Sequence, residues 1–461
     1  MAVNFPKKFK DAIEKASQDE ELQQVLRHNT GAAFQRAEEA KQQFSDLSRT
    51  KKRASFLRLK ILEELDRHLI QFESNFTSRG GKVLWANDEK EACEKILKLV
   101  KGHESKMCLR GRSKTIDEIG IVPFLEKKDI HVISTDTDSI IAEIQGRKQS
   151  HMVYPTMSIP KDTAVDSLKE KYFSADSEVD DNTIVKALRG NLSDDIKDVK
   201  VAITGANFLT SDTGSISIIS DEGNILMATA EPKLHIVVAG IDKLIPTVED
   251  LALFWPLVSS FAGGGKISAV NTIFNGPRQQ DEPDGPDEMV VVILDNGRSD
   301  ILAKKRHRRI LTCIHCGACQ NVCPVYKIIG GEAYQTTYTG PYGIIVTPLM
   351  KGFKEYQHLS YASTLCGKCS EACPVDINLH DMILYNRHEA VKEGVDDQTI
   401  KKYVRAYKFI TLSRKRMNFG SAGFKNSILK MIIKDDWGTR RKMPTIAQKN
   451  FNQLYHEKKN R

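Results

Sequence analysis

The chain has 461 residues, a formal net charge of +8, 40% hydrophobic residues and 28% charged residues. These values are ordinary for a soluble protein with two or three domains, and such mild basicity does not indicate nucleic-acid binding. No apolar run approaches the roughly 20 residues of a membrane span, and the polar start has no signal-peptide core. The sequence therefore predicts a cytoplasmic protein with no integral membrane segment and no nucleic-acid partner. In that reducing compartment, cysteines indicate metal rather than disulfides.

Residues 1–75 are predicted to be helical, because Leu57, Ile61, Leu65 and Leu69 recur at four-residue steps among charged residues. From 76 to 300, short strands alternate with helices. We expect strands at 81–86, 131–135, 199–204, 235–239 and 290–294. This alternation predicts a three-layer α/β domain.

Two further features complete the predicted domain organisation. Apolar runs at 216–220 and 225–228 flank a polar turn, which predicts a β-hairpin. The acidic, proline-rich stretch 276–288 is expected to be a surface loop. The predicted domains are an N-terminal helical region (1–75), the α/β domain (76–300), a mostly helical cysteine region (301–395) and a basic C-terminal extension (396–461) that begins with a helix.

Seven of the nine cysteines form two short motifs, C-x2-C-x2-C-x3-C-P and C-x2-C-x3-C-P. They are Cys313, Cys316, Cys319, Cys323, Cys366, Cys369 and Cys373. Spacing of this kind directs three thiolates to one iron–sulfur cluster and the fourth to another. The crossed ligation assigns Cys313, Cys316, Cys319 and the distant Cys373 to cluster one. Cluster two receives Cys366, Cys369 and the distant Cys323.

The two motifs are copies of each other. Residues 316–325 and 366–375 align without gaps at a shift of 50, and that shift puts Ser363 opposite Cys313. The second motif is therefore a dicluster motif whose first cysteine is replaced by serine. Cluster two is either a [3Fe-4S] centre or a [4Fe-4S] cube completed by Ser363, water or a residue from elsewhere.

Other cofactors fit the sequence poorly. Structural zinc takes paired C-x2-C units, and no C-x2-C here is followed by the histidine of a c-type haem. The run Gly263-Gly-Gly265 does not continue into a dinucleotide fingerprint, and Gly265-Lys266 is not part of a phosphate-binding loop. The remaining cysteines, Cys93 and Cys108, are expected to be packed as small hydrophobic residues.

Two segments outside the motifs are candidate binding sites. The Gly-, Thr- and Ser-rich segment 204–215 follows a predicted strand, where it would connect strands or bind a carboxylate such as lactate, with Glu231, Lys233 and His235 contributing charge. The basic run 304–309 precedes the first motif. It is either a solvated face or a docking patch for an acidic electron-transfer partner.

The motif pair, preceded by Ile-Thr-Gly-Ala-Asn-Phe at 203–208 and Leu-Asp-Asn-Gly-Arg at 294–298, resembles the lactate-utilisation protein B family over nearly the full length. The resemblance implies a lactate-utilisation (LUD) α/β domain, two clusters that are most often [4Fe-4S], and electron transport in oxidation of L-lactate to pyruvate. It also implies two companions, a cysteine-rich-domain protein and a small LUD-domain protein. Iron–sulfur subunits of glycolate oxidase and heterodisulfide reductase resemble the cysteine region but usually carry eight motif cysteines, and Ser363 departs from that pattern.

We therefore expect an iron–sulfur electron-transfer subunit of an L-lactate-oxidising system. The main alternative is a catalytic subunit whose incompletely Cys-ligated second cluster offers an open iron to a hydroxy acid. A third possibility is an assembly scaffold stabilised by its clusters. No catalytic residue is indicated by the sequence.

Overall fold

The computed structural model describes residues 4–148, 150–173, 180–395, 398–437 and 442–459. The chain divides into two units, Met1–Glu393 and Gly394–Arg461. The second unit is helical and consists of α20 (Gln398–Thr411), α21 (Arg414–Asn418), α22 (Ala422–Trp437) and α23 (Phe451–Lys459). Among the helices in these described ranges, none combines the length and apolar character needed to cross a membrane.

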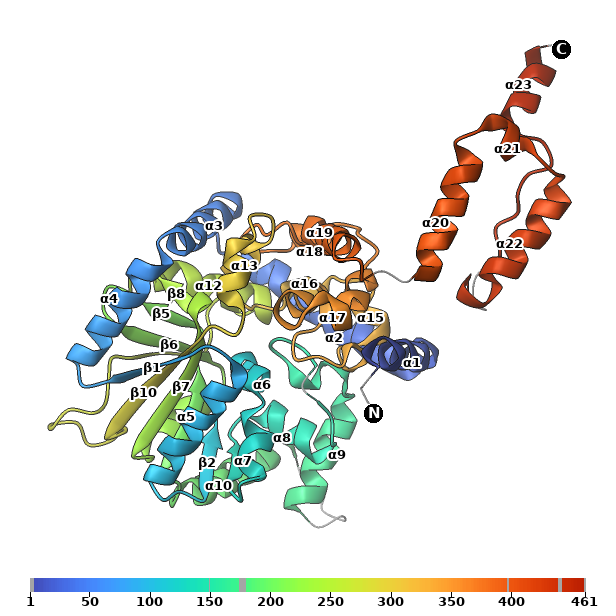
Figure 1. Cartoon of the computed structure of the whole chain (residues 1–461). Coiled ribbons are helices and arrows are strands. Elements are labelled where there is room, and N and C mark those ends of the chain that lie inside the picture. Colours follow the sequence, from blue (N-terminus) through green and yellow to red (C-terminus); the bar gives the residue numbers. More distant parts are fainter. Residues whose placement is uncertain (1–3, 149, 174–179, 396–397, 438–441, 460–461) are drawn as a thin grey trace. The chain divides into compact units, whose positions relative to one another are not determined.

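A six-stranded parallel sheet organises the first unit, in the order β1-β10-β7-β4-β2-β3 (Figure 1). Its strands are β1 (Lys82–Ala86), β2 (Met107–Arg110), β3 (His131–Ser134), β4 (Val201–Gly205), β7 (Leu234–Gly240) and β10 (Glu288–Leu294). The five strands predicted from the sequence are all present, and β2 was not predicted. Runs such as Met-Val-Val-Val-Ile-Leu in β10 are apolar at consecutive positions because both faces of a parallel sheet are buried.

The two faces of this sheet are covered differently. Ile236 and Val238 of β7 face a core formed with helices α5 (Glu89–Gly102), α6 (Lys114–Ile119) and α7 (Ile121–Glu126). Val237 and Ala239 face a second core, which contains α12 (Leu251–Ala262) and a smaller sheet. The result is the three-layer α/β domain that the sequence predicts.

The smaller sheet has four strands in the order β8-β5-β6-β9. They are β5 (Phe208–Thr210), β6 (Ser215–Ser220), β8 (Leu244–Ile245) and β9 (Val270–Phe274). The predicted hairpin at 216–228 is wrong, because β6 pairs with β5 and β9 and is followed by a helix, α11 (Asn224–Ala230). Gly223 at φ 71° turns the chain into this helix, and Ile225, Ala228 and Thr229 are buried at helical spacing.

Four helices precede the sheet, as predicted for residues 1–75: α1 (Phe5–Gln18), α2 (Glu20–Lys41), α3 (Leu47–Glu63) and α4 (Leu65–Ser78). Asp19 and Asp46 cap α2 and α3, each accepting a hydrogen bond of 2.9 Å from a backbone N–H three residues on. Leu26 of α2 lies in the same core as Tyr326 of the cysteine region. The N-terminal helices therefore pack against the cysteine region and α12.

The cysteine region holds helices and, within its described residues, no strand. Its helices are α13 (Arg298–Ala303), α14 (Ala318–Asn321), α15 (Tyr326–Ile329), α16 (Gly340–Lys351), α17 (Phe353–Tyr356), α18 (Lys368–Glu371) and α19 (Leu379–Lys392). The remaining helices of the first unit are α8 (Thr137–Ile144), α9 (Lys161–Tyr172) and α10 (Asp181–Ile196). Single 3-10 turns are η1 (Pro155–Ser158), η2 (Ile241–Lys243), η3 (Arg308–Thr312), η4 (Glu332–Tyr334) and η5 (Gln357–Tyr361).

Candidate functional site

Four of the motif thiols line one small cavity: Cys313, Cys316, Cys319 and Cys373. Cys313 and Cys316 lie in the loop between η3 and α14, Cys319 lies within α14, and Cys373 follows α18. Burial raises the pKa of Cys313, and the neighbouring Cys316 and Cys373 raise it further. Thiols that raise one another's pKa lie close together, so the structure gathers the set that the sequence assigns to cluster one.

The other three motif thiols lie near one another in the same way. Burial raises the pKa of Cys369 to about 12, and Cys323 and Cys366 contribute to that rise. Cys366 is exposed, whereas Cys323 and Cys369 are buried. The pKa of Cys366 is lowered, chiefly by the backbone N–H of Lys368. The second set of thiols therefore reaches the protein surface at Cys366.

The two cysteine loops share a backbone conformation fifty residues apart. His315 and Leu365 both have positive φ, at 55° and 56°. The N–H of His315 donates to Cys313 Sγ at 3.4 Å, and the N–H of Leu365 donates to Ser363 Oγ at 3.1 Å. Ser363 thus stands in its loop as Cys313 stands in the first.

The glycines of the two loops are also equivalent. Gly317 and Gly367 have φ of 74° and 83°, a conformation that favours glycine, and each directly precedes a short helix, α14 or α18. A Cβ at Gly317 would lie 3.0 Å from His151 Cε1, whereas one at Gly367 would meet nothing within 4 Å. The loop around the first set is therefore the more tightly packed of the two.

The backbone around the thiols suits an iron–sulfur cluster. Across the described ranges, no group of three His, Cys, Asp or Glu side chains is placed to hold one metal ion. A cube instead binds each thiolate to a different iron, and backbone N–H groups stabilise its sulfurs. Such donors are present: the N–H groups of His315 and Ile377 each lie 3.4 Å from a motif sulfur, Cys313 and Cys373 respectively.

A buried arginine from α3 joins the first cysteine loop to the α/β domain. Arg58 is 1% exposed, and its guanidinium donates to the carbonyls of Leu244 at 2.5 Å, Leu311 at 2.9 Å and Thr312 at 3.2 Å. Leu244 lies in β8, and Thr312 directly precedes Cys313. One side chain therefore fixes the position of the first thiol relative to the sheets.

A second buried connection is ionic. Arg298 forms two hydrogen bonds with Glu118, at 2.8 and 2.7 Å, and one with Asp242 at 2.6 Å. Tyr338 of the cysteine region donates to Glu118 at 2.6 Å. Burial alone would raise the pKa of Glu118, but Arg298 more than offsets this effect, and the pKa lies below its usual value.

The two cysteines outside the motifs are buried, as predicted. Burial raises the pKa of Cys93 to about 11 and that of Cys108 to about 12. Neither thiol lines the cavity between the first four cysteines. Both are packed as small apolar residues.

The predicted carboxylate site is only partly present. Within 204–215, Gly205, Ala206 and Asn207 line a cavity, whereas Phe208–Thr210 form β5 and the residues after it turn the chain into β6. His235 is buried against Thr204, with Nε2 2.7 Å from Oγ1, and burial lowers its pKa to about 3. Lys233 lies at the amino end of β7, at the other edge of the sheet.

Most of the residues that form this cavity lie outside the predicted segment and were missed. Besides Asn207 after β4, the carboxyl ends of three more strands supply them: Arg112 and Ser113 after β2, Asp136 and Asp138 after β3, and Lys243 after β7. A signal existed, because Asp136 and Asp138 directly follow a strand that was predicted.

Only some side chains of the basic run 304–309 are exposed. His307 is 2% exposed, and Arg309 Nη2 donates to Ser55 Oγ at 2.8 Å. Lys305 and Arg306 are exposed. The exposed part available for docking is therefore smaller than the sequence suggests.

Comparison with known proteins defines the class. The LUD domain family matches residues 69–294, and the 4Fe-4S dicluster domain family matches residues 309–377. The chain is thus a parallel-sheet α/β LUD domain followed by a helical 4Fe-4S dicluster region. A solved DUF162 family protein from Deinococcus radiodurans is 16% identical, with a TM-score of 0.29, over 50% of this chain and 98% of that one.

Curated relatives give the family. Lactate utilization protein B of Bacillus cytotoxicus is 35% identical over 389 residues, which cover 84% of this chain and 82% of that protein. The proteins of the same name from Bacillus thuringiensis and Bacillus anthracis are 34% identical over 387 residues, 84% of this chain and 81% of each relative. The chain belongs to the lactate utilization protein B family.

Proposed function

We propose that this chain is the iron–sulfur electron-transfer protein of a cytoplasmic system that oxidises L-lactate to pyruvate and so allows growth on lactate. Its partners would be the two companion lactate-utilisation proteins, one with cysteine-rich domains and one with a small LUD domain. Membership of the lactate utilization protein B family supports the pathway. The observation that supports the electron-transfer role is the pair of adjacent thiol sets, four around one small cavity and three near one another.

In this proposal, cluster one is held by Cys313, Cys316, Cys319 and Cys373, and cluster two by Cys323, Cys366 and Cys369. When bound, the clusters supply one-electron redox chemistry. The protein holds the thiols, donates N–H groups to sulfur and restricts water around the first set. Burial raises the pKa of Cys319 of the first set, and Cys369 of the second set raises it further, so these two thiols lie near each other. This proximity supports a short path for electrons between the clusters.

The second cluster is proposed to be a [4Fe-4S] cube with Ser363 as its fourth ligand. The equivalent placement of Ser363 and Cys313 supports this choice over a [3Fe-4S] centre. Arg387 holds the serine loop through hydrogen bonds to the carbonyls of Ser360 at 2.9 Å and Ser363 at 3.0 Å. A hydroxyl in that position has the same opportunity to meet iron as the thiol of the first loop.

The two clusters have different access to partners. All four thiols of the first set lie in or beside the core, whereas Cys366 of the second set is exposed and flanked by the exposed Lys368. Electrons would therefore enter at cluster one and leave at cluster two. The exposed Lys368 beside Cys366 would favour an acidic acceptor, since complementary charge accelerates encounter.

The first test is the visible absorption of the anaerobic, cluster-loaded protein before and after L-lactate, with dithionite as the positive control. We expect bleaching by dithionite and none by lactate alone, because the two-electron oxidation needs a partner. Bleaching by lactate alone would overturn the relay function and favour the catalytic alternative. Protein without iron, or clusters that dithionite does not reduce, would remove the proposed function altogether.

A further inference from the structure

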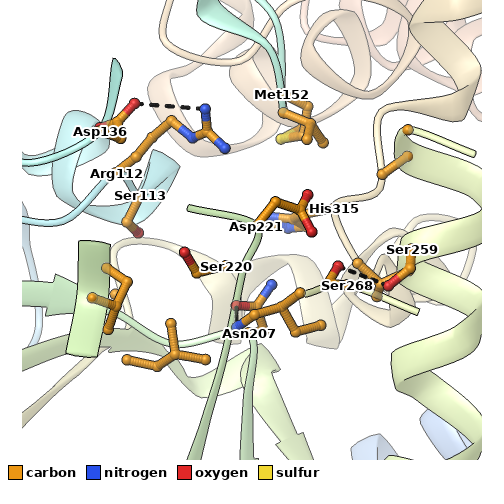
Figure 2. Close-up of a pocket in the computed structure, with 18 of the residues that line it drawn as sticks. Arg112, Ser113, Asp136, Met152, Asn207, Ser220, Asp221, Ser259, Ser268 and His315 are labelled. Carbon is orange, nitrogen blue, oxygen red and sulfur yellow. Dashed lines mark hydrogen bonds and ion pairs between the residues drawn. The ribbon is translucent and has the colours of Figure 1, made fainter. Parts of the chain in front are cut away.

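A cavity of about 380 Å³ lies where the α/β domain meets the first cysteine loop. Ser113, Asp136, Asn207 and Lys243 approach it from the carboxyl ends of four neighbouring parallel strands (Figure 2 labels the first three). Open α/β sheets bind ligands at this edge. The cavity therefore has the position of a ligand site, and the family comparisons assign it no ligand.

Most acidic groups at the cavity are already engaged. Asp136 and Asp138 lie 3.6 and 3.2 Å from the guanidinium of Arg112. Glu222 accepts hydrogen bonds from the N–H and the hydroxyl of Thr137, at 3.0 and 2.7 Å. Arg112 is thus neutralised by its two carboxylates, and Glu222 is held by a helix N-terminus.

The rim carries one more acid. Asp221 is exposed and accepts a hydrogen bond of 3.1 Å from the N–H of Ala269. Because it lies in solvent, its charge is screened more than that of a group inside the cavity. The wall inside the cavity, in contrast to this exposed rim, carries buried cations.

Two buried lysines line that interior wall, Lys243 and Lys114, and Lys114 is paired with Asp117 at 3.5 Å. Lys243 lies nearer the cysteine loop. It is 5% exposed, and its Nζ lies 3.0 Å from Nδ1 of His315, to which it donates. Asp242 and Cys313 act on Lys243 as opposite charges, but Asp242 is already hydrogen-bonded to Arg298 at 2.6 Å. A buried ammonium that shares its nearest carboxylate with another cation is incompletely compensated, and an anion bound in the cavity would complete the compensation. Burial also lowers the pKa of Lys243, to about 8.

The cavity shares a wall with the first thiol set. Met152 and His315 line it, and the same two side chains line the small cavity among Cys313, Cys316, Cys319 and Cys373. Figure 2 shows both side chains at the border of the larger cavity. A molecule bound there would be separated from cluster one by a single layer of side chains.

We propose that this cavity binds a small monocarboxylate with a hydroxyl or keto group beside the carboxylate, of the lactate and pyruvate class. Lys243 receives the carboxylate, and Ser113 and Asn207 offer polar partners to the second oxygen. The inference rests on the proposed function for its choice of ligand and concerns binding alone. The two-electron oxidation still requires the companion proteins.

The test is anaerobic titration calorimetry of L-lactate into the full, cluster-loaded chain. Wild type is expected to bind, and Lys243→Gln to weaken binding at least about tenfold, the size of a lost charge-assisted hydrogen bond. Lys233→Gln is the matched control, because this exposed lysine lies at the other end of β7; its affinity is expected to equal wild type. Absence of binding to wild type, or equal affinity in Lys243→Gln, would overturn the proposal.

A second measurement decides the matter if Lys243→Gln loses its clusters. Dithionite-reduced wild type is mixed with ¹³C-labelled L-lactate, and electron–nuclear double resonance is recorded on the signal of cluster one. Coupling to ¹³C supports the site, and its absence at saturating lactate overturns it. Iron content and dithionite bleaching are measured on the same samples. Normal bleaching without lactate binding would reject the proposed lactate site and leave the electron-transfer function standing. Lactate binding to protein without reducible clusters would reject the electron-transfer function and leave the lactate site standing.

Discussion

Ser363 occupies in the second cysteine loop the position that Cys313 occupies in the first. Each accepts a hydrogen bond from the backbone N–H two residues on, and each donor residue has a left-handed backbone. A tight loop whose N–H groups point inward suits a thiolate bound to iron. The shared loop geometry supports the proposal that Ser363 faces the second cluster.

Replacing Ser363 tests its role as a ligand. Ser363→Ala is expected to lose the fourth iron of cluster two and to show the paramagnetic signal of an oxidised [3Fe-4S] centre. Ser363→Cys is expected to keep the [4Fe-4S] cube with a changed reduction potential and unchanged turnover in the reconstituted lactate-oxidising system. Iron and sulfide analysis with electron paramagnetic resonance measures both variants.

The control for these variants is Ser360→Ala, because the Ser360 hydroxyl is buried without a hydrogen-bond partner in the described part of the chain. It is expected to retain the iron content of wild type. Full iron content in Ser363→Ala would exclude the serine as a ligand. Loss of turnover in Ser363→Cys would favour the catalytic alternative, in which an open iron binds the substrate.

The glycines of the two loops form a matched pair for stability. Alanine at either position would have to adopt a left-handed backbone conformation, which lowers stability by about 1 kcal/mol. Gly317→Ala also brings a Cβ to 3.0 Å from His151, so we expect roughly 1 kcal/mol more from crowding. The midpoint of thermal unfolding of anaerobic, cluster-loaded protein should therefore fall further for Gly317→Ala than for Gly367→Ala. Equal midpoints would show that the first loop relaxes without cost.

Much of this protein could be predicted from sequence because its signals are local. The motif spacing and the shift of 50 specify the two thiol sets and single out Ser363, and apolar runs reveal five of the six parallel strands. Strand β2 escaped because its four residues, Met107–Arg110, include only a short apolar stretch. The segment after β6 was misread because Ile225 and Ala228 fit a strand as well as a helix over so few residues.

The cavity and the buried links could not be predicted, because they join residues far apart in the chain. Lys243 and His315 are 72 residues apart, and Arg58 reaches the carbonyl of Leu311 across 253 residues. Nothing in the local sequence distinguishes Lys243 from the solvated Lys233 ten residues earlier. Only the fold separates the two lysines, since β7 runs between them and places them at opposite ends of the sheet.

The buried ion pair between Glu118 and Arg298 is expected to matter more than any surface pair. Glu118→Gln leaves part of a buried charge uncompensated, so we expect a loss of about 3 kcal/mol of stability. The control is Glu288→Gln, whose exposed pair with Lys82 at 2.6 Å should contribute about 0–1 kcal/mol. Chemical denaturation of the cluster-loaded protein, followed by circular dichroism, measures both.

The same pair predicts a pH dependence. Because the pKa of Glu118 is lowered in the folded protein, its stabilisation is complete above the unfolded pKa of about 4.3 and is lost only as pH falls through the folded value. The difference in the free energy of unfolding between wild type and Glu118→Gln should therefore be constant from about pH 7 to about pH 5. A difference that already narrows over this range would mean that the carboxyl is protonated in the folded state.

Thiol reactivity should follow burial and cluster ligation. In the anaerobic, cluster-loaded protein at about pH 8, iodoacetamide is expected to modify none of the nine cysteines, because seven are bound to iron and the pKa values of Cys93 and Cys108 are raised to about 11 and 12. When an iron chelator removes the clusters, iodoacetamide should modify Cys366 first, since this thiol is exposed and its pKa is lowered. Mass spectrometry of the modified peptides gives the order. Cys93→Ala should retain full iron content as the control, and modification of Cys93 or Cys108 before denaturation would contradict their packing in the core.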